Sequence, residues 1–92
     1  MNVVTLRVRL NLRQARTLKD KRQVVRSVLA RLRTSFNISV AEIDARDHPQ
    51  AVVLGLACVA EEAGAARATL EEVANALRAH PVAEFVAAEW DV

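Results

Sequence analysis

Apolar and polar residues alternate along residues 3–10, where Val4, Leu6 and Val8 fall on one face of an extended chain and Arg7 falls on the other. A period of two is typical of a β-strand that buries one face. We therefore predict the first strand at residues 3–10.

A helix is predicted from Leu18 to about Thr34, because apolar residues recur within one arc when successive residues are placed about 100° apart. The residues of this arc are Leu18, Val24, Val25, Val28, Leu29 and Leu32. Thr17 is a residue type that caps helix N-termini, and Asp20 suits a first turn, near the positive end of the helix dipole. We expect the helix to begin directly after Thr17.

Alternation returns in residues 36–46, with Ile38 and Val40 on one face, and predicts a second strand. Ile43 falls out of this alternation. We therefore expect a β-bulge or a strand end near Ala41–Glu42.

Residues 51–60 (AVVLGLACVA) are apolar at almost every position, which predicts a third strand with two apolar faces. Residues 61–80 predict a second helix that Pro81 ends. Its expected buried stripe consists of Ala66, Leu70, Val73, Ala74 and Leu77. Residues 82–92 predict a last strand. Its expected anchors are Val82, Val86 and Trp90.

The predicted order of elements, βαββαβ, defines the fold class. Two interleaved strand–helix–strand units with right-handed crossovers give an α+β ferredoxin-like sandwich, a four-stranded antiparallel sheet with two helices on one face. The length suits one such domain, residues 1–92.

The third strand is central in this topology, so one of its apolar faces must lie on the open side of the sheet. Val53, Ala57 and Val59 make up one face, and Val52, Leu54, Leu56 and Cys58 make up the other. Whichever set lies on the open side, we expect a homodimer contact or another partner there. The alternative is a small exposed patch of the kind that monomers tolerate.

Charge is divided unevenly along the chain. Residues 1–36 contain ten Arg or Lys and one acid, whereas residues 37–92 contain three Arg and ten acids, which gives net charges of +9 and −7. Such asymmetry favours a polyanion or an acidic partner on the basic side. Two solvated faces that partly neutralise each other are the alternative.

The basic residues of the first helix form a stripe. Lys19, Arg22, Arg26 and Arg33 recur along one flank over about four turns. Lys21 falls within the apolar arc, where its stem could be buried while its amine reaches water. The predicted nucleic-acid-binding residues are Arg16, Lys19, Lys21, Arg22, Arg26 and Arg33.

This stripe can follow a phosphate backbone, because each neutralised phosphate releases counterions and arginine can grip phosphate through two hydrogen bonds. Two other interpretations remain open. The stripe could meet an acidic protein, or it could be a solvated flank whose arginines pair with Glu71, Glu72 or Glu89.

The sequence gives little support for chemistry other than binding. Cys58 lies within an apolar strand and is expected to be an inert buried thiol, and two glycines do not make a phosphate-binding loop. His48 and His80 each precede a proline, where either could cap a turn or merely decorate it. The one conceivable metal site matches no specific motif and is better interpreted as a solvated acidic edge; it comprises Glu42, Asp44, Asp47 and His48. We expect a non-enzymatic protein with no cofactor, metal site or small-molecule substrate.

Membrane association is not expected. The longest apolar run, residues 51–60, is half the length of a membrane-spanning helix, which needs about 20 residues. Arg7 and Arg9 interrupt the first apolar segment, so we expect no signal peptide. A cytoplasmic location is the expectation that follows.

The run ARTLKDKRQVVRSVLARLRTSFNISVAEID, residues 15–44, resembles the signature of the YlxP-like family, a bacterial family of unknown function. VVLG at residues 52–55 extends the resemblance. The matching residues are Ala15, Arg16, Leu18, Lys19, Lys21, Arg22, Val25, Arg26, Leu32, Arg33, Phe36, Asn37, Ser39, Val40 and Glu42.

This resemblance implies a ferredoxin-like fold and bacterial genes beside those for translation initiation and ribosome maturation. It therefore implies a role with RNA or the ribosome, and it supplies no catalytic residues. The sequence departs from the family at Gln14, often a small residue, and at His48-Pro49, which replace an aromatic residue that could contact a partner.

Base stacking on the sheet is not expected, although RNA-recognition modules share this topology. Those modules stack bases on aromatic residues of the third strand, and residues 51–60 contain none. We expect contact through the first helix and the loop before it, with the RNA backbone or a duplex as the target.

Overall fold

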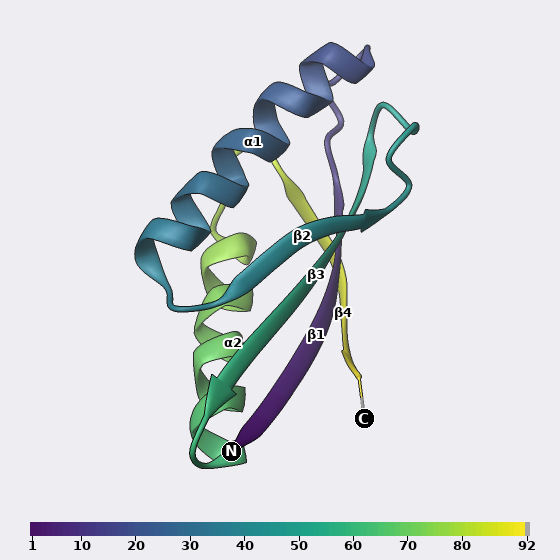
Figure 1. Ribbon diagram of the computed structural model, residues 1–92. Coiled ribbons are helices and arrows are strands. Elements are labelled where there is room, and N and C mark those ends of the chain that lie inside the picture. The colour runs from purple at the N-terminus through teal and green to yellow at the C-terminus, as the bar shows by residue number, and fades with distance from the viewer. Residues whose placement is uncertain (92) are drawn as a thin grey trace.

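The computed structural model describes residues 1–91 and has the predicted order of elements (Figure 1). The elements are β1 (Asn2–Asn11), α1 (Leu18–Ser35), β2 (Ser39–Asp44), β3 (Ala51–Ala60), α2 (Ala63–Arg78) and β4 (Glu84–Asp91). The predicted last strand ran to Val92, which lies outside the described residues.

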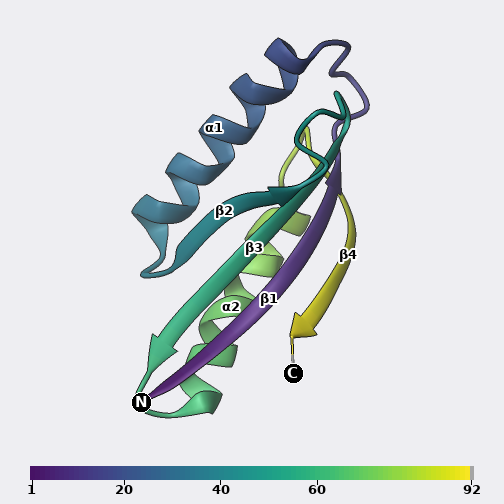
Figure 2. The same ribbon diagram turned by 45° about the vertical axis from the view of Figure 1, so that its right-hand side comes forward.

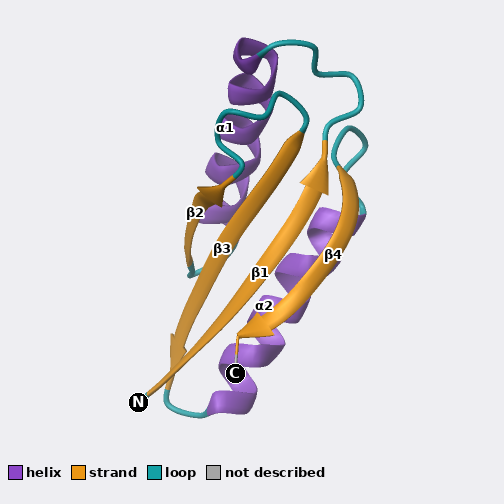
Figure 3. Ribbon diagram, turned by 90° about the vertical axis from the view of Figure 1, so that its right-hand side faces the viewer, coloured by secondary structure: helices purple, strands orange, loops and turns teal. Residues whose placement is uncertain are grey.

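The four strands form one antiparallel sheet in the order β2-β3-β1-β4. β1 and β3 are central and pair along their whole length, from Asn2 opposite Ala60 to Asn11 opposite Ala51. Figure 3 views the open face of this sheet, with both helices behind it, α1 on the β2 side and α2 on the β4 side. The predicted ferredoxin-like α+β fold is confirmed.

The core lies between the sheet and the helices. Leu6, Val8 and Leu10 of β1 point into it, as the alternation predicts. β3 contributes Val52, Leu54, Leu56 and Cys58, and α2 contributes the predicted stripe of Ala66, Leu70, Val73, Ala74 and Leu77. From α1 the core takes Val25, Val28 and Leu32, while Leu18, Val24 and Leu29 remain partly exposed.

The start of α1 is fixed by a reciprocal cap. Thr17 Oγ1 accepts a hydrogen bond from the Asp20 backbone N–H at 3.1 Å, and Asp20 Oδ2 accepts from the backbone N–H groups of Arg16 and Thr17 at 3.0 and 3.2 Å. The hydrogen bonds from Arg16 and Thr17 favour the charged carboxylate and lower the pKa of Asp20. The predicted cap is confirmed.

β2 is shorter than the predicted 36–46 segment, because Phe36 still donates its backbone N–H to Leu32 O of α1. The expected bulge is present one residue later than predicted, between Glu42 and Asp44. Ile43 at this bulge covers Gly55 on the open face, where an added Cβ would lie 2.8 Å from Ile43 Cγ2.

The predicted anchors of β4 are wrong in two of three cases. Val82 and Val86 are 43% and 56% exposed, and only Trp90 packs against the core. Val82 lies before β4 begins. For Val86 the reason is a register shift in the pairing with β1: Ala88 lies opposite Val8, but Phe85 lies opposite Leu10. Val86 is the extra residue, so the inward-facing positions change phase there.

Neither helix is long and apolar enough to cross a membrane.

Candidate anion-binding groove

A groove of about 560 Å³ runs between α1 and the β2–β3 hairpin. We call it the arginine groove. One wall is α1, with Arg22, Val25, Arg26, Leu29 and Arg33, and the other is β2 and the loop after it, with Glu42, Arg46 and Asp47. The groove therefore carries four guanidinium groups against two carboxylates.

The structure places the predicted binding residues in three different settings. Arg22, Arg26 and Arg33 line the groove. Arg16 and Lys19 are exposed near the start of α1 but do not line it. Lys21 is buried, and the expectation that its amine reaches water is wrong.

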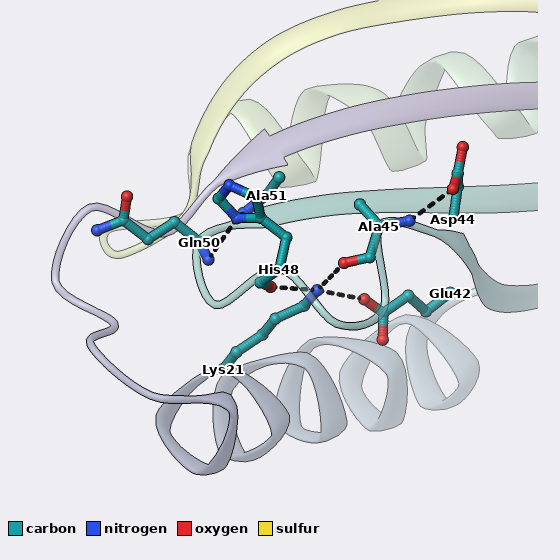
Figure 4. A network of polar contacts seen from close by, with 7 residues as sticks. All are labelled: Lys21, Glu42, Asp44, Ala45, His48, Gln50 and Ala51. Atoms are coloured by element: carbon teal, nitrogen blue, oxygen red, sulfur yellow. Dashed lines mark hydrogen bonds and ion pairs between the residues drawn. The ribbon is translucent and has the colours of Figure 1, made fainter.

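Lys21 is 1% exposed because its amine has partners inside the protein. Nζ donates to Ala45 O at 2.6 Å and to His48 O at 2.8 Å, and it lies 2.8 Å from Glu42 Oε2 (Figure 4). Three oxygen atoms thus replace water around the ammonium group, and they remove Lys21 from the exposed basic surface. We call this arrangement the loop clamp.

Arg46 is the groove residue that the sequence analysis missed. Arg46 lies in the acidic half of the chain and outside the basic stripe, so the charge pattern did not indicate a binding role for it. The one indication in the sequence was its position in a loop directly after a strand whose alternation breaks at Ile43. The fold brings this loop to the same end of the molecule as the β1–α1 loop (Figure 2).

The loop that carries Arg46 is held at many points. Ala45 has a positive φ of 56°, which is uncommon for a residue with a side chain. His48 N donates to Ala45 O at 3.0 Å, and His48 Nδ1 accepts from the backbone N–H groups of Gln50 and Ala51 at 3.0 and 2.9 Å (Figure 4). The imidazole of His48 therefore caps this turn.

A second set of contacts ties the loop to the segment before α1. Gln50 Nε2 donates to Ala15 O at 3.2 Å, and Leu12 donates its backbone N–H to Gln50 O at 2.8 Å. Together with the loop clamp, these contacts fix the loop relative to α1.

Five exposed basic residues of α1 and the segment just before it have no carboxylate partner among the described residues, whereas Arg13, earlier in that segment, pairs with Glu84. Within residues 1–91, no carboxylate forms an ion pair with Arg16, Lys19, Arg22, Arg26 or Arg33. Of the three acids considered as partners, Glu71 pairs with Arg67 and Glu89 pairs with Arg9. Arg33 donates to Val40 O at 2.8 Å, which anchors one end of its guanidinium.

The open face of the sheet has a second hollow, of about 380 Å³. Five of the residues that line it are small: Thr5, Ser39, Ala41, Gly55 and Ala57. Val3, Ile43 and Val59 are exposed, and β1 and β3 place Val3 opposite Val59. Arg7 and two β4 acids, Glu89 and Asp91, also line the hollow.

Other candidate groups have structural partners. His80 Nδ1 accepts from the backbone N–H groups of Val82 and Ala83, and burial together with the charge of Arg31 lowers the pKa of His80. Cys58 is a buried free thiol. No group of three or more His, Cys, Asp or Glu residues in the described chain is arranged to hold a metal ion.

Fold and groove together define a small ferredoxin-like domain with an arginine-lined groove between its first helix and its second hairpin. The chain belongs to the family described as Protein of unknown function (DUF503), whose model matches residues 3–90. No curated protein matches the chain.

Proposed function

We propose that this protein is a non-enzymatic RNA-binding protein that holds the phosphate backbone in the arginine groove. The observation that carries the proposal is the set of guanidinium groups along one groove. Within residues 1–91, none of the guanidinium groups that α1 contributes forms an ion pair with a carboxylate. Guanidinium groups bind phosphate oxygens through paired hydrogen bonds, and each contact releases counterions from the nucleic acid.

The position of the aromatic residues favours backbone contact over base stacking. β3 has no aromatic residue, and the rings of Phe85 and Trp90 pack against the core on the helix side of the sheet. Arg78 and Arg67 of α2 cover these rings, with guanidinium carbons 4.4 and 4.1 Å from the ring centres. An RNA ligand would thus be recognised by its phosphates and its shape.

The resemblance to the YlxP-like family directs the proposal toward the ribosome. The resemblance implies that the gene for this protein lies beside bacterial genes for translation initiation and ribosome maturation. Ribosomal RNA is therefore the ligand to test first. A bacterial cytoplasmic location belongs to the same proposal.

Charge reversal tests the proposal. Arg22→Glu/Arg26→Glu places two negative charges on the helix wall, and we expect binding of a labelled ribosomal RNA fragment, followed by fluorescence anisotropy, to be lost. Arg7→Glu/Arg31→Glu changes the net charge equally on surfaces outside the groove and should retain most of the affinity. Equal losses in the two variants would contradict a site in the groove.

We propose as a second candidate a homodimer that stacks two open sheet faces. Exposed Val3, Ile43 and Val59 supply apolar area, while Arg7 on β1 and Asp91 on β4 give the face both charges that a two-fold contact between identical surfaces can pair. We expect sedimentation to show a dimer at micromolar concentration and Val59→Glu to give a monomer. A monomer in both cases contradicts this candidate.

A further inference from the structure

The loop clamp holds the two ends of the short segment that carries Arg46. Ala45 and His48 flank Arg46 and Asp47, and both of their carbonyl oxygens accept hydrogen bonds from Lys21 Nζ (Figure 4). Lys21 extends from the first turn of α1, next to Arg22 of the groove. A single buried amine therefore links the helix wall of the groove to its loop wall.

Stability alone is a weak reason for such an arrangement. Burying a charged pair costs desolvation energy, and well-packed apolar residues at the same place are often equally stable. The hydrogen bonds to two specific carbonyl groups provide geometry that an apolar residue cannot provide. They also hold the positive φ of Ala45, a backbone conformation that persists only where the surrounding structure maintains it.

The charges of the groove leave Arg46 available for an anion. Glu42 lies against Lys21, so its negative charge is compensated within the clamp. Asp47 is the other acid of the lining, against four guanidinium groups. No carboxylate in the described part of the chain forms an ion pair with Arg46.

We propose that Arg46 binds a phosphate group from the loop side of the arginine groove, opposite Arg22 and Arg26, and that Lys21 is the positioning residue that holds it there. The inference rests on the proposed function and extends it, because it makes the site two-walled. A phosphate between two walls is gripped by guanidinium groups from separate elements. The loop clamp removes the entropy cost of ordering the loop at the moment of binding.

The test measures the salt dependence of RNA affinity in a set of matched variants. Arg46→Ala should lower the affinity several-fold and reduce the slope of log affinity against log salt by about 0.7 to 0.9, the value for one phosphate contact. Lys21→Met/Glu42→Gln removes one charge of each sign, so the net charge of the protein is unchanged. It should cause the same loss as Arg46→Ala.

Combination of these variants separates positioning from a general loss of structure. With Arg46→Ala already present, Lys21→Met/Glu42→Gln should cause little further loss, because the side chain that it positions is gone. With Arg33→Ala present instead, the affinity losses of Arg33→Ala and of Lys21→Met/Glu42→Gln should add. Arg33 is anchored on Val40 O and not on the loop, so the loop clamp does not position it. Additive losses with Arg46→Ala would overturn the role of Lys21.

A second variant loosens the loop without touching the buried amine. His48→Ala removes the acceptor of the Gln50 and Ala51 N–H groups and should reduce the salt slope as Lys21→Met/Glu42→Gln does. Thermal melting of each variant reports whether it is folded. If Lys21→Met/Glu42→Gln does not fold, the His48→Ala variant alone tests whether the loop positions Arg46. An unchanged salt slope in a folded His48→Ala protein would overturn the positioning role of the loop.

Inorganic phosphate distinguishes the source of the ligand. Titration of the wild-type protein, followed by NMR of the backbone amides of residues 45–48, should show shifts that Arg46→Ala abolishes. RNA binding that depends on Arg46, with or without these shifts, supports the site as one for backbone phosphates.

If RNA does not bind but the shifts occur, the proposed function fails and a site for free phosphate stands. If wild-type protein binds RNA and Arg46→Ala leaves affinity and slope unchanged, this inference fails and the proposed function stands. If neither ligand binds, both fail.

Discussion

Lys21 differs from the other basic residues of α1 because its amine contacts three oxygen atoms instead of water. The helical period places Lys21 within the apolar arc, and that part of the prediction holds. The partners could not be predicted, because Ala45, His48 and Glu42 are more than twenty residues away and meet the lysine only through the bulged end of β2. The hydrophobic pattern predicts which face of the helix a side chain occupies, but it does not predict the residues that the side chain contacts.

His80 is the residue for which the structure predicts a dependence on pH. Burial, and then the charge of Arg31, lowers the pKa of His80 from 6.5, and its Nδ1 accepts two backbone N–H groups. The unfolded chain therefore binds a proton more readily than the folded chain. The free energy of unfolding should fall as the pH drops below about 6.5.

The measurement is urea denaturation of the wild-type protein and of His80→Asn at a series of pH values. Asparagine can accept from the same backbone N–H groups but does not titrate in this range. We expect the variant to lose less stability than the wild type between about pH 7.5 and 5.5. Parallel pH profiles would show that His80 makes no such contribution.

At the scale of elements, the two bulges mark where alternation stops being a guide. In β2 the break at Ile43 was visible in the sequence, because an apolar residue fell out of phase. In β4 the break at Val86 was not visible, because its neighbours Phe85, Ala87 and Ala88 make either phase look apolar. Only pairing with β1 selects the phase that packs Phe85 and Trp90 against the core.

The bulge at Ile43 leads to a prediction about Gly55. Gly55→Ala should destabilise the protein by about 1 kcal/mol, because the new Cβ would meet Ile43 Cγ2 and move it. In an Ile43→Ala background, the same change should cost much less. Urea denaturation of the single and double variants gives the comparison, and equal costs in both backgrounds would argue against this contact.

The cap of α1 gives a second prediction at this scale. Thr17→Ala should lower the free energy of unfolding by about 1 kcal/mol, since it removes the acceptor for the Asp20 backbone N–H. Thr17→Ser keeps a hydroxyl and is the matched control. Both proteins should be compared by urea denaturation, and a Ser variant as weakened as the Ala variant would exclude the hydroxyl as the cause.

For the whole molecule, the charge asymmetry of the sequence becomes a surface only through the fold. Most of the basic residues belong to the first half of the chain, and the stripe on α1 could be predicted from periodicity alone. The second wall of the groove could not, because Arg46 reaches it by the return of the β2–β3 hairpin toward α1. The sequence thus predicted the fold and the basic stripe that forms one wall of the groove.

The salt dependence of RNA binding tests the central claim most directly. If Arg22, Arg26, Arg33 and Arg46 each contact a phosphate, log affinity should fall with log salt with a slope of about −3 to −4. The slope and the binding should be lost together in Arg22→Glu/Arg26→Glu. No binding at low salt, or a slope that this double variant leaves unchanged, would contradict the assignment of the arginine groove as an RNA site.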